Sequence, residues 1–143
     1  MTAPTAATVR VTRRFTASPE RVFDAWLDPD KARKFLFATP HGGMVRADVD
    51  PRVGGQFTFT DRRDGVDVVH TGEYLEIDRP RRLVFTFAVP QYSPVVTTVT
   101  IEITALDGGC ELTLIHDGVL PEYESRTQEG WGKILAGLAA ALG

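Results

Sequence analysis

The sequence has few residues of the kinds that reactive centres use. Its 143 residues include one cysteine and three histidines. Cys110 cannot form an internal disulfide, which is typical of proteins from a reducing compartment, so we expect a cytoplasmic protein. Cys110 follows two glycines, opens an apolar strand and has no base beside it in the sequence. We therefore expect a small, partly buried hydrophobic side chain and not a nucleophile.

The histidines do not form a metal-binding pattern. His41, His70 and His116 lie far apart, and none has metal-ligand spacing from another or from Cys110. The glycine pairs precede expected strands and not helices, so they are not phosphate loops, and no Gly-x-Ser-x-Gly elbow is present. We expect no metal and no cofactor. No catalytic set follows from the sequence, and whether the chain is an enzyme stays open.

The chain also lacks an excess of positive charge and any long apolar run. Its 16 basic and 19 acidic residues give a net charge of −3, which argues against nucleic-acid binding. The arginine pairs at 13–14, 62–63 and 81–82 are expected at solvated strand ends and turns. No segment reaches the roughly 20 apolar residues of a membrane span. The first eight residues have neither the basic start nor the apolar core of a signal peptide.

The order of elements is the most informative feature that is present. Residues 8–16 alternate and predict a first strand, while residues 1–7 are small and expected to be frayed. Ser18-Pro19-Glu20 is typical of a helix start, with a capping serine and proline at the first helical position. Asp28-Pro29 interrupts this helix and starts a second short one, with apolar Ala32, Phe35 and Leu36.

From Met44 onward, apolar side chains recur at every second residue, as in β-strands. Strands are predicted over 44–49, 56–60, 66–77, 83–89, 95–105 and, after the turn at 107–109, from Cys110 onward. Asp64-Gly65 is a hairpin turn signal. The alternation predicts a sheet with one buried face and one polar face, the latter carrying Thr98, Thr100, Glu102 and Thr104.

After Pro121 the period becomes helical. An apolar stripe at spacings of four, three and four comprises Trp131, Leu135, Leu138 and Leu142. Three glycines interrupt this helix, which either allows close approach to the sheet or a ligand, or marks a kinked start. We expect this helix to be the only element that covers the buried face. The order β-α-α-β-β-β-β-β-β-α predicts an α+β protein, with a curved antiparallel sheet around the long C-terminal helix in one domain over residues 8–143.

The aromatic side chains give the candidate site. We expect a ligand cavity between sheet and helix that is lined or supported by Trp26, Phe57, Phe59, His70, Tyr74, Phe85, Phe87, His116, Trp131 and Leu135. His116 shares its face with Leu112 and Leu114, so it either bonds a backbone carbonyl or acts as a general base. Glu73 faces water unless a bulge near Gly72 reverses the strand. Alternation alone leaves open whether side chains fill this space.

Motifs over nearly the whole chain resemble the START-like (SRPBCC) superfamily, and more narrowly the small bacterial relatives of the activator of the heat-shock protein 90 ATPase. The matching residues are 23–26 and 28–29, Gly54-Gly55 with Phe57, 72–74, 80–87, 112–114 with His116, and 129–131. The resemblance implies the helix-grip fold with a cavity. It departs from the pattern at Cys110, where threonine is common, and at Phe35, where a second tryptophan is common.

Three functions follow from the resemblance and the residues together. The first is a protein that binds a hydrophobic small molecule of aromatic, polyketide-like or lipid-like structure. The second is a polyketide cyclase-, aromatase- or hydrolase-like enzyme that uses the same cavity with His116 or Glu73 as base. The third is a stress-response co-chaperone that modulates the heat-shock protein 90 ATPase. This function needs an exposed apolar patch on the outer face or an open groove. A monomer and a homodimer are both compatible with the sequence.

Overall fold

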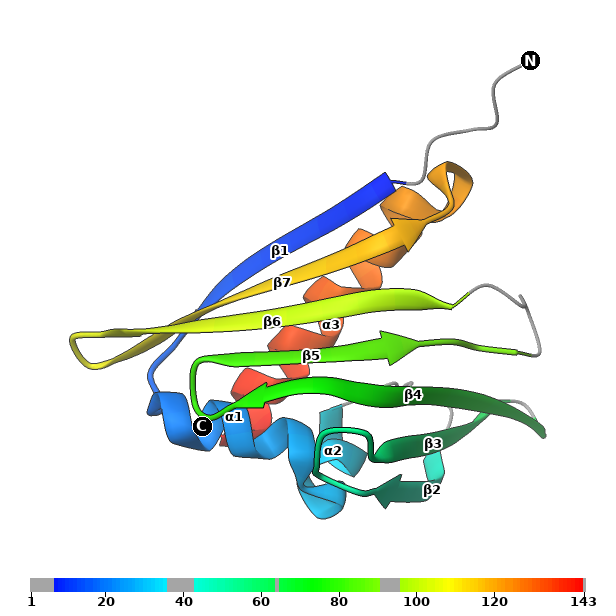
Figure 1. Cartoon of the computed structure of the whole chain (residues 1–143), viewed down its shortest axis with the longest axis horizontal. Coiled ribbons are helices and arrows are strands. Elements are labelled where there is room, and N and C mark those ends of the chain that lie inside the picture. Colours follow the sequence, from blue (N-terminus) through cyan, green and yellow to red (C-terminus); the bar gives the residue numbers. More distant parts are fainter. Residues whose placement is uncertain (1–6, 36–42, 64, 91–95, 143) are drawn as a thin grey trace.

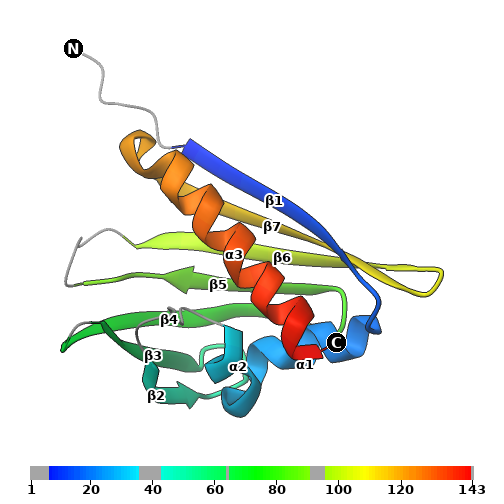
Figure 2. The ribbon, with the colours of Figure 1, turned by 180° about the vertical axis from the view of Figure 1, so that it is seen from behind.

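The computed structural model describes residues 7–35, 43–63, 65–90 and 96–142. The expectations for residues 1–6, Leu36, His41, Asp64 and Val95 lie outside this part of the chain. The described residues form one antiparallel sheet with helices on one face (Figures 1 and 2). Its strands are β1 (Ala7–Phe15), β2 (Gly43–Val49), β3 (Gln56–Arg63), β4 (Val66–Asp78), β5 (Arg82–Phe87), β6 (Thr97–Leu106) and β7 (Gly109–Val119).

The strands are arranged in the order β1-β7-β6-β5-β4-β3-β2. The first strand therefore pairs with the last one, and the remaining strands follow one another as a meander. The helices are α1 (Pro19–Leu27), α2 (Pro29–Phe35) and α3 (Glu124–Leu142), and a 3-10 turn, Pro121–Tyr123, precedes α3. In Figure 2, α3 crosses the sheet diagonally, while α1 and α2 lie beside its C-terminal end. The predicted α+β fold with a curved sheet around a C-terminal helix is confirmed.

The ends of the short helices follow from their local sequence. The Ser18 hydroxyl accepts a hydrogen bond from the Arg21 backbone N–H, as expected for a capping serine. Helix α1 ends at Leu27, and the Asp28 side chain accepts the Asp30 backbone N–H at the start of α2. The interruption predicted at Asp28-Pro29 is confirmed. Ala7 was expected in the frayed terminus but pairs with Val119 in the sheet.

The inner face of the sheet forms the hydrophobic core together with all three helices. Leu83, Ile101, Leu112 and Leu114 are fully buried on the strands. Helix α3 buries its stripe of Trp131, Leu135, Leu138 and Leu142. The expectation that α3 alone covers the sheet was wrong, because α1 and α2 bury Val22, Phe23, Ala25, Trp26 and Ala32 in the same core.

The irregularity in β4 lies two residues later than expected. Tyr74 is 2% exposed on the inner face, in phase with His70 and Val68. The register with β5 shifts between Tyr74 and Glu76, and Leu75 is exposed. The phase therefore changes after Tyr74 and not at Gly72, which leaves Glu73 on the outer side of the strand.

The outer face of the sheet is largely polar. Arg82 forms ion pairs with Glu76 and Glu102, and the Thr8 hydroxyl donates to Asp117. Thr100 was expected to be exposed but is only 8% exposed, because Val84 and Ile115 flank it on the neighbouring strands. The exposed large apolar side chains of the described residues are distributed over several elements: Val45, Val53, Val66, Leu75, Val96, Leu106, Leu120 and Tyr123.

Candidate functional site

The candidate residues all come from the inner face of the sheet or from the helices that cover it. Trp26 lies on α1, while Trp131 and Leu135 lie on α3. The strands β3, β4, β5 and β7 supply the others. Nine of the ten side chains are at most 5% exposed, and Phe87 alone is partly exposed. The aromatic rings form two groups with different surroundings.

The first group is centred on Phe57. Its ring lies 5.4 Å from Phe59, 5.5 Å from Tyr74 and 5.4 Å from Phe85, measured between ring centres. Gly72 allows this packing, because a Cβ atom at Gly72 would overlap the Phe57 ring and the Thr86 carbonyl oxygen. Burial raises the pKa of the Tyr74 hydroxyl. These four rings are packed as a core.

The second group surrounds Phe87, and we call Trp26, His70, Phe87, His116 and Trp131 the Phe87 cluster. The Phe87 ring centre lies 6.0 Å from His70, 5.6 Å from His116 and 6.1 Å from Trp131. Trp26 joins through Trp131 at 6.3 Å. Phe87 remains partly exposed despite these contacts. The cluster therefore combines an accessible aromatic ring with buried nitrogen atoms.

A directed chain of hydrogen bonds runs through this cluster. Trp131 Nε1 donates to His116 Nδ1 at 2.9 Å, because an indole N–H can only donate. The neutral imidazole then carries its proton on Nε2, which lies 2.6 Å from Thr97 Oγ1. The Thr97 hydroxyl in turn donates to the Phe87 carbonyl oxygen at 3.1 Å. Every hydrogen bond of this chain therefore has a defined donor, and the direction of donation runs from Trp131 through His116 and Thr97 to the Phe87 carbonyl.

Burial and this chain of hydrogen bonds both favour the neutral form of His116. Burial lowers the pKa of His116 to about 4, with a smaller opposing effect from Asp117. Both ring nitrogens are engaged, so no lone pair is left for a substrate proton. The arrangement does not support His116 as a general base. The expected bond to a backbone carbonyl is replaced by Trp131 and Thr97, and Thr97 is the group that reaches the carbonyl.

The other polar candidates are placed differently. His70 Nδ1 lies 3.3 Å from the Phe59 carbonyl oxygen, which can only accept, so Nδ1 is the donor. Glu73 lies on the outer side of β4, and its backbone N–H donates to Thr86 Oγ1 at 2.9 Å. Glu73 is therefore not an interior carboxylate.

Sequence reasoning missed one buried carboxylate. Asp61 is 0% exposed on the inner face of β3, opposite Val68 and next to the Phe59–His70 pair. Buried aspartates are rare and concentrate at functional sites. Its phase with Phe57 and Phe59 could have indicated this position. The arginine pair that follows Asp61 is expected at a solvated strand end, and Arg62 there pairs with Asp67.

The remaining chemistry of the described residues is limited. Among them, no group of three or more histidine, cysteine, aspartate or glutamate side chains could hold a metal ion. Cys110 is fully buried, and burial raises the pKa of its thiol. Within the same part of the chain, no helix has the length and apolar character to cross a bilayer.

A curved antiparallel sheet crossed by one long C-terminal helix defines a helix-grip protein of the START-like (SRPBCC) superfamily. The chain belongs to the family described as Activator of Hsp90 ATPase homolog 1-like protein, which it matches over residues 16–143. The family predicted from the motifs is therefore confirmed. No curated protein matches the sequence.

Several solved bacterial structures share the fold. A protein from Chromobacterium violaceum is 28% identical, with a TM-score of 0.86 and coverage of 93% of this chain and 94% of that one. An AHSA1-like protein from Aeromonas hydrophila is 21% identical, with a TM-score of 0.83 and coverage of 95% and 92%. A protein from Rhodobacter sphaeroides is 22% identical, with a TM-score of 0.83 and coverage of 99% and 95%.

Proposed function

We propose that this protein binds a hydrophobic small molecule between the sheet and α3, at the Phe87 cluster. The observation that supports the proposal is the partial exposure of Phe87, an inner-face aromatic side chain that contacts three other rings. A side chain that served only the core would be expected to be as buried as Phe57 or Phe85. An accessible aromatic ring beside a few buried polar groups is typical of small-molecule sites.

The chemistry of the cluster favours an uncharged ligand with an aromatic or polyketide-like ring system. Tryptophan, phenylalanine and histidine rings offer faces and edges for stacking. The His116 ring of this cluster is uncharged at neutral pH, because its pKa is lowered to about 4. The Phe57 group and Leu135 would support this site from behind. A fatty-acid-like ligand would make less use of the aromatic rings.

Catalysis in the same site receives less support from the geometry. The two candidate bases were His116 and Glu73. His116 uses both nitrogens within the protein, and Glu73 lies on the outer side of β4. Binding is therefore the function that we propose, with no reaction assigned.

The co-chaperone function receives support from the family name alone. It requires an apolar patch on the outer face or an open groove. The outer face of the described strands carries ion pairs and threonines. The exposed apolar side chains of the described residues are scattered over several elements. Scattered single side chains of this kind do not mark an interface.

A thermal-shift screen against uncharged aromatic, polyketide, sterol and lipid ligands tests the proposal. A ligand at a hundred times its dissociation constant adds about 2.7 kcal/mol of stability, which raises Tm by several degrees. Any ligand found is then titrated against Phe87→Ala and against Leu75→Ala, which makes a comparable truncation on an exposed side chain. We expect at least tenfold weaker binding to Phe87→Ala and unchanged binding to Leu75→Ala. Equal affinities for the two variants would contradict the proposed site.

A further inference from the structure

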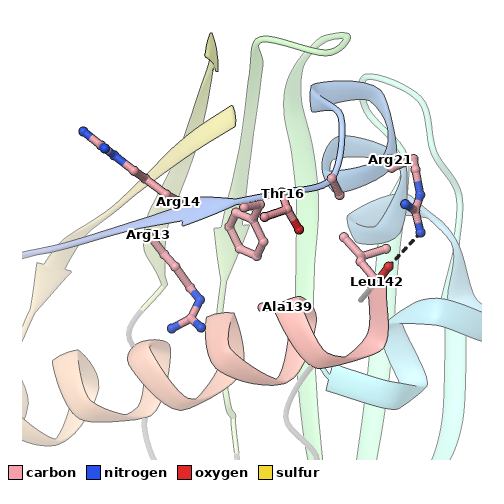
Figure 3. Close-up of a pocket in the computed structure, with 8 residues that line it drawn as sticks. Arg13, Arg14, Thr16, Arg21, Ala139 and Leu142 are labelled. Carbon is pink, nitrogen blue, oxygen red and sulfur yellow. Dashed lines mark hydrogen bonds between the residues drawn. The ribbon is translucent and has the colours of Figure 1, made fainter. Parts of the chain in front are cut away.

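A pocket lies at the edge of the sheet, between the end of β1 and the C-terminal end of α3 (Figure 3). Its volume is about 310 Å³, near the lower limit of pockets that hold small molecules. It is lined by Arg13, Arg14, Phe15, Thr16, Ala17, Arg21, Ala139 and Leu142. None of these residues belongs to the Phe87 cluster, so the pocket is separate from the proposed ligand site.

The floor of this pocket is apolar. Phe15 is 6% exposed, and Ala17 and Leu142 are 8% exposed. Ala139 is partly buried and packs against the same core. These side chains leave a short apolar surface between strand and helix, large enough for a ring or a short alkyl chain.

The pocket has three guanidinium groups and no carboxylate among its lining residues. Arg14 pairs with Glu111 at 3.2 Å and points away from the hollow in Figure 3. Arg21 Nη2 donates to the Leu142 carbonyl oxygen at 2.9 Å, at the helix end where the macrodipole is negative. A guanidinium has five N–H donors, so Arg21 retains others.

Arg13 differs from both. It is in phase with Val11 and Phe15 on the inner face of β1, and Figure 3 shows its side chain directed toward α3. It is exposed, and it makes no ion pair or hydrogen bond with any residue in the described part of the chain. An arginine on an apolar face needs a reason. One reason is protection of the edge strand against association. The other is an anion in the pocket.

We propose that this pocket binds a small organic carboxylate, with the carboxylate paired to Arg13 and its apolar body on Phe15, Ala139 and Leu142. Arginine and carboxylate form two parallel hydrogen bonds in matching planes, which gives both strength and orientation. The apolar floor favours an anion with a hydrocarbon part. A fully hydrated anion such as phosphate would gain nothing from that apolar floor.

Two-dimensional ¹H–¹⁵N NMR with benzoate as the probe tests this proposal. We expect benzoate to move the backbone signals of Phe15, Thr16 and Ala139, and to leave the two indole signals of Trp26 and Trp131 unchanged. Neutral benzamide and inorganic phosphate should bind at least tenfold more weakly than benzoate. Equal binding of benzamide would show that the charge has no role, and equal binding of phosphate that the apolar floor has none; either result would overturn the proposal.

Three variants complete the test. Arg13→Gln should weaken benzoate binding at least tenfold, whereas Arg10→Gln, an exposed arginine on the outer face of the same strand, should have no effect. Ala139→Leu keeps every charge but fills the floor, and it should also abolish binding. Equal losses in Arg10→Gln and Arg13→Gln would indicate general attraction of anions and overturn the site. Two results together would overturn the site and assign Arg13 to protection of the edge strand instead. The Arg13→Gln protein would self-associate, and the Ala139→Leu protein would bind benzoate as well as the wild type does.

Discussion

Trp131 donates its indole N–H to Nδ1 of His116 across 2.9 Å, and this bond fixes the ring nitrogen on which His116 carries its proton. The helix α3 thereby holds an inner-face residue of β7 in one tautomer. The Thr97 hydroxyl on β6 accepts a hydrogen bond from His116 Nε2 and donates one to the Phe87 carbonyl oxygen. A histidine held in this way is a structural and orienting group of the site.

The pH dependence of stability should report the low pKa of His116. The neutral ring is favoured in the folded state, so its stabilising effect is complete above pH 6.5 and is lost as the pH falls toward about 4. The difference between pKa values of 6.5 and about 4 corresponds to about 3 kcal/mol. Urea unfolding of the wild type and of His116→Gln at pH 7 and pH 4.5 measures this effect. We expect the wild type to lose more stability than the variant, and parallel losses would contradict the buried neutral histidine.

Trp131→Phe should act on His116 directly. The variant leaves Nδ1 without its donor, which costs about 1–3 kcal/mol for a buried acceptor. It also removes the bond that opposes protonation of Nδ1, so the pKa of His116 should rise, although burial still holds it below 6.5. An NMR titration of the histidine ring protons measures that pKa. Trp26→Phe removes the same atoms from the other buried tryptophan, and there the pKa of His116 should stay low.

Two glycine substitutions should have opposite effects. Gly72→Ala places a Cβ atom against the Phe57 ring and the Thr86 carbonyl, and overpacking of this kind costs about 1–3 kcal/mol. Gly130→Ala meets open space in α3 and should stabilise by about 0.5–1 kcal/mol through the higher helix propensity of alanine. Denaturant unfolding at pH 7 measures both. A destabilised Gly130→Ala protein would indicate that the glycine serves a purpose beyond helix packing.

The Cys110 thiol should be unreactive in the folded protein. It is fully buried, its sulfur contacts the Ala17 carbonyl at 3.6 Å, and burial raises its pKa. Because it is the only cysteine, labelling by a thiol reagent gives one clean signal. We expect the labelling rate to follow global unfolding across a urea series. Rapid labelling in buffer alone would contradict its burial.

Much of the fold could be predicted from the sequence because hydrophobic period and capping residues act locally. Alternation placed Phe57, Phe85 and His116 on the inner face, and Ser18 marked the start of α1. The same rule would have placed Asp61 and Arg13 on that face. The arginine pairs at 13–14 and 62–63 are instead expected at solvated strand ends, because charged side chains are seldom buried.

The partners within the site could not be predicted in the same way. The alternation of a strand predicts which face of the sheet each side chain lies on. It does not predict which residues of a curved sheet and of the helix that crosses it come into contact. The Trp131–His116–Thr97 chain joins α3, β7 and β6, and its geometry depends on how α3 crosses the sheet. The role of α1 and α2 in closing the core depends on the same tertiary arrangement.

The most direct test of binding at the Phe87 cluster is an NMR titration with a ligand found in the thermal-shift screen. The titration follows the two indole N–H signals. The chain has only two tryptophans, and both belong to the Phe87 cluster, so their signals report on that site alone. Binding between sheet and α3 predicts saturable shifts of the Trp131 signal, accompanied by the Trp26 signal, with the same dissociation constant as the thermal effect. A ligand that stabilises the protein while both indole signals stay unchanged would contradict the proposed site.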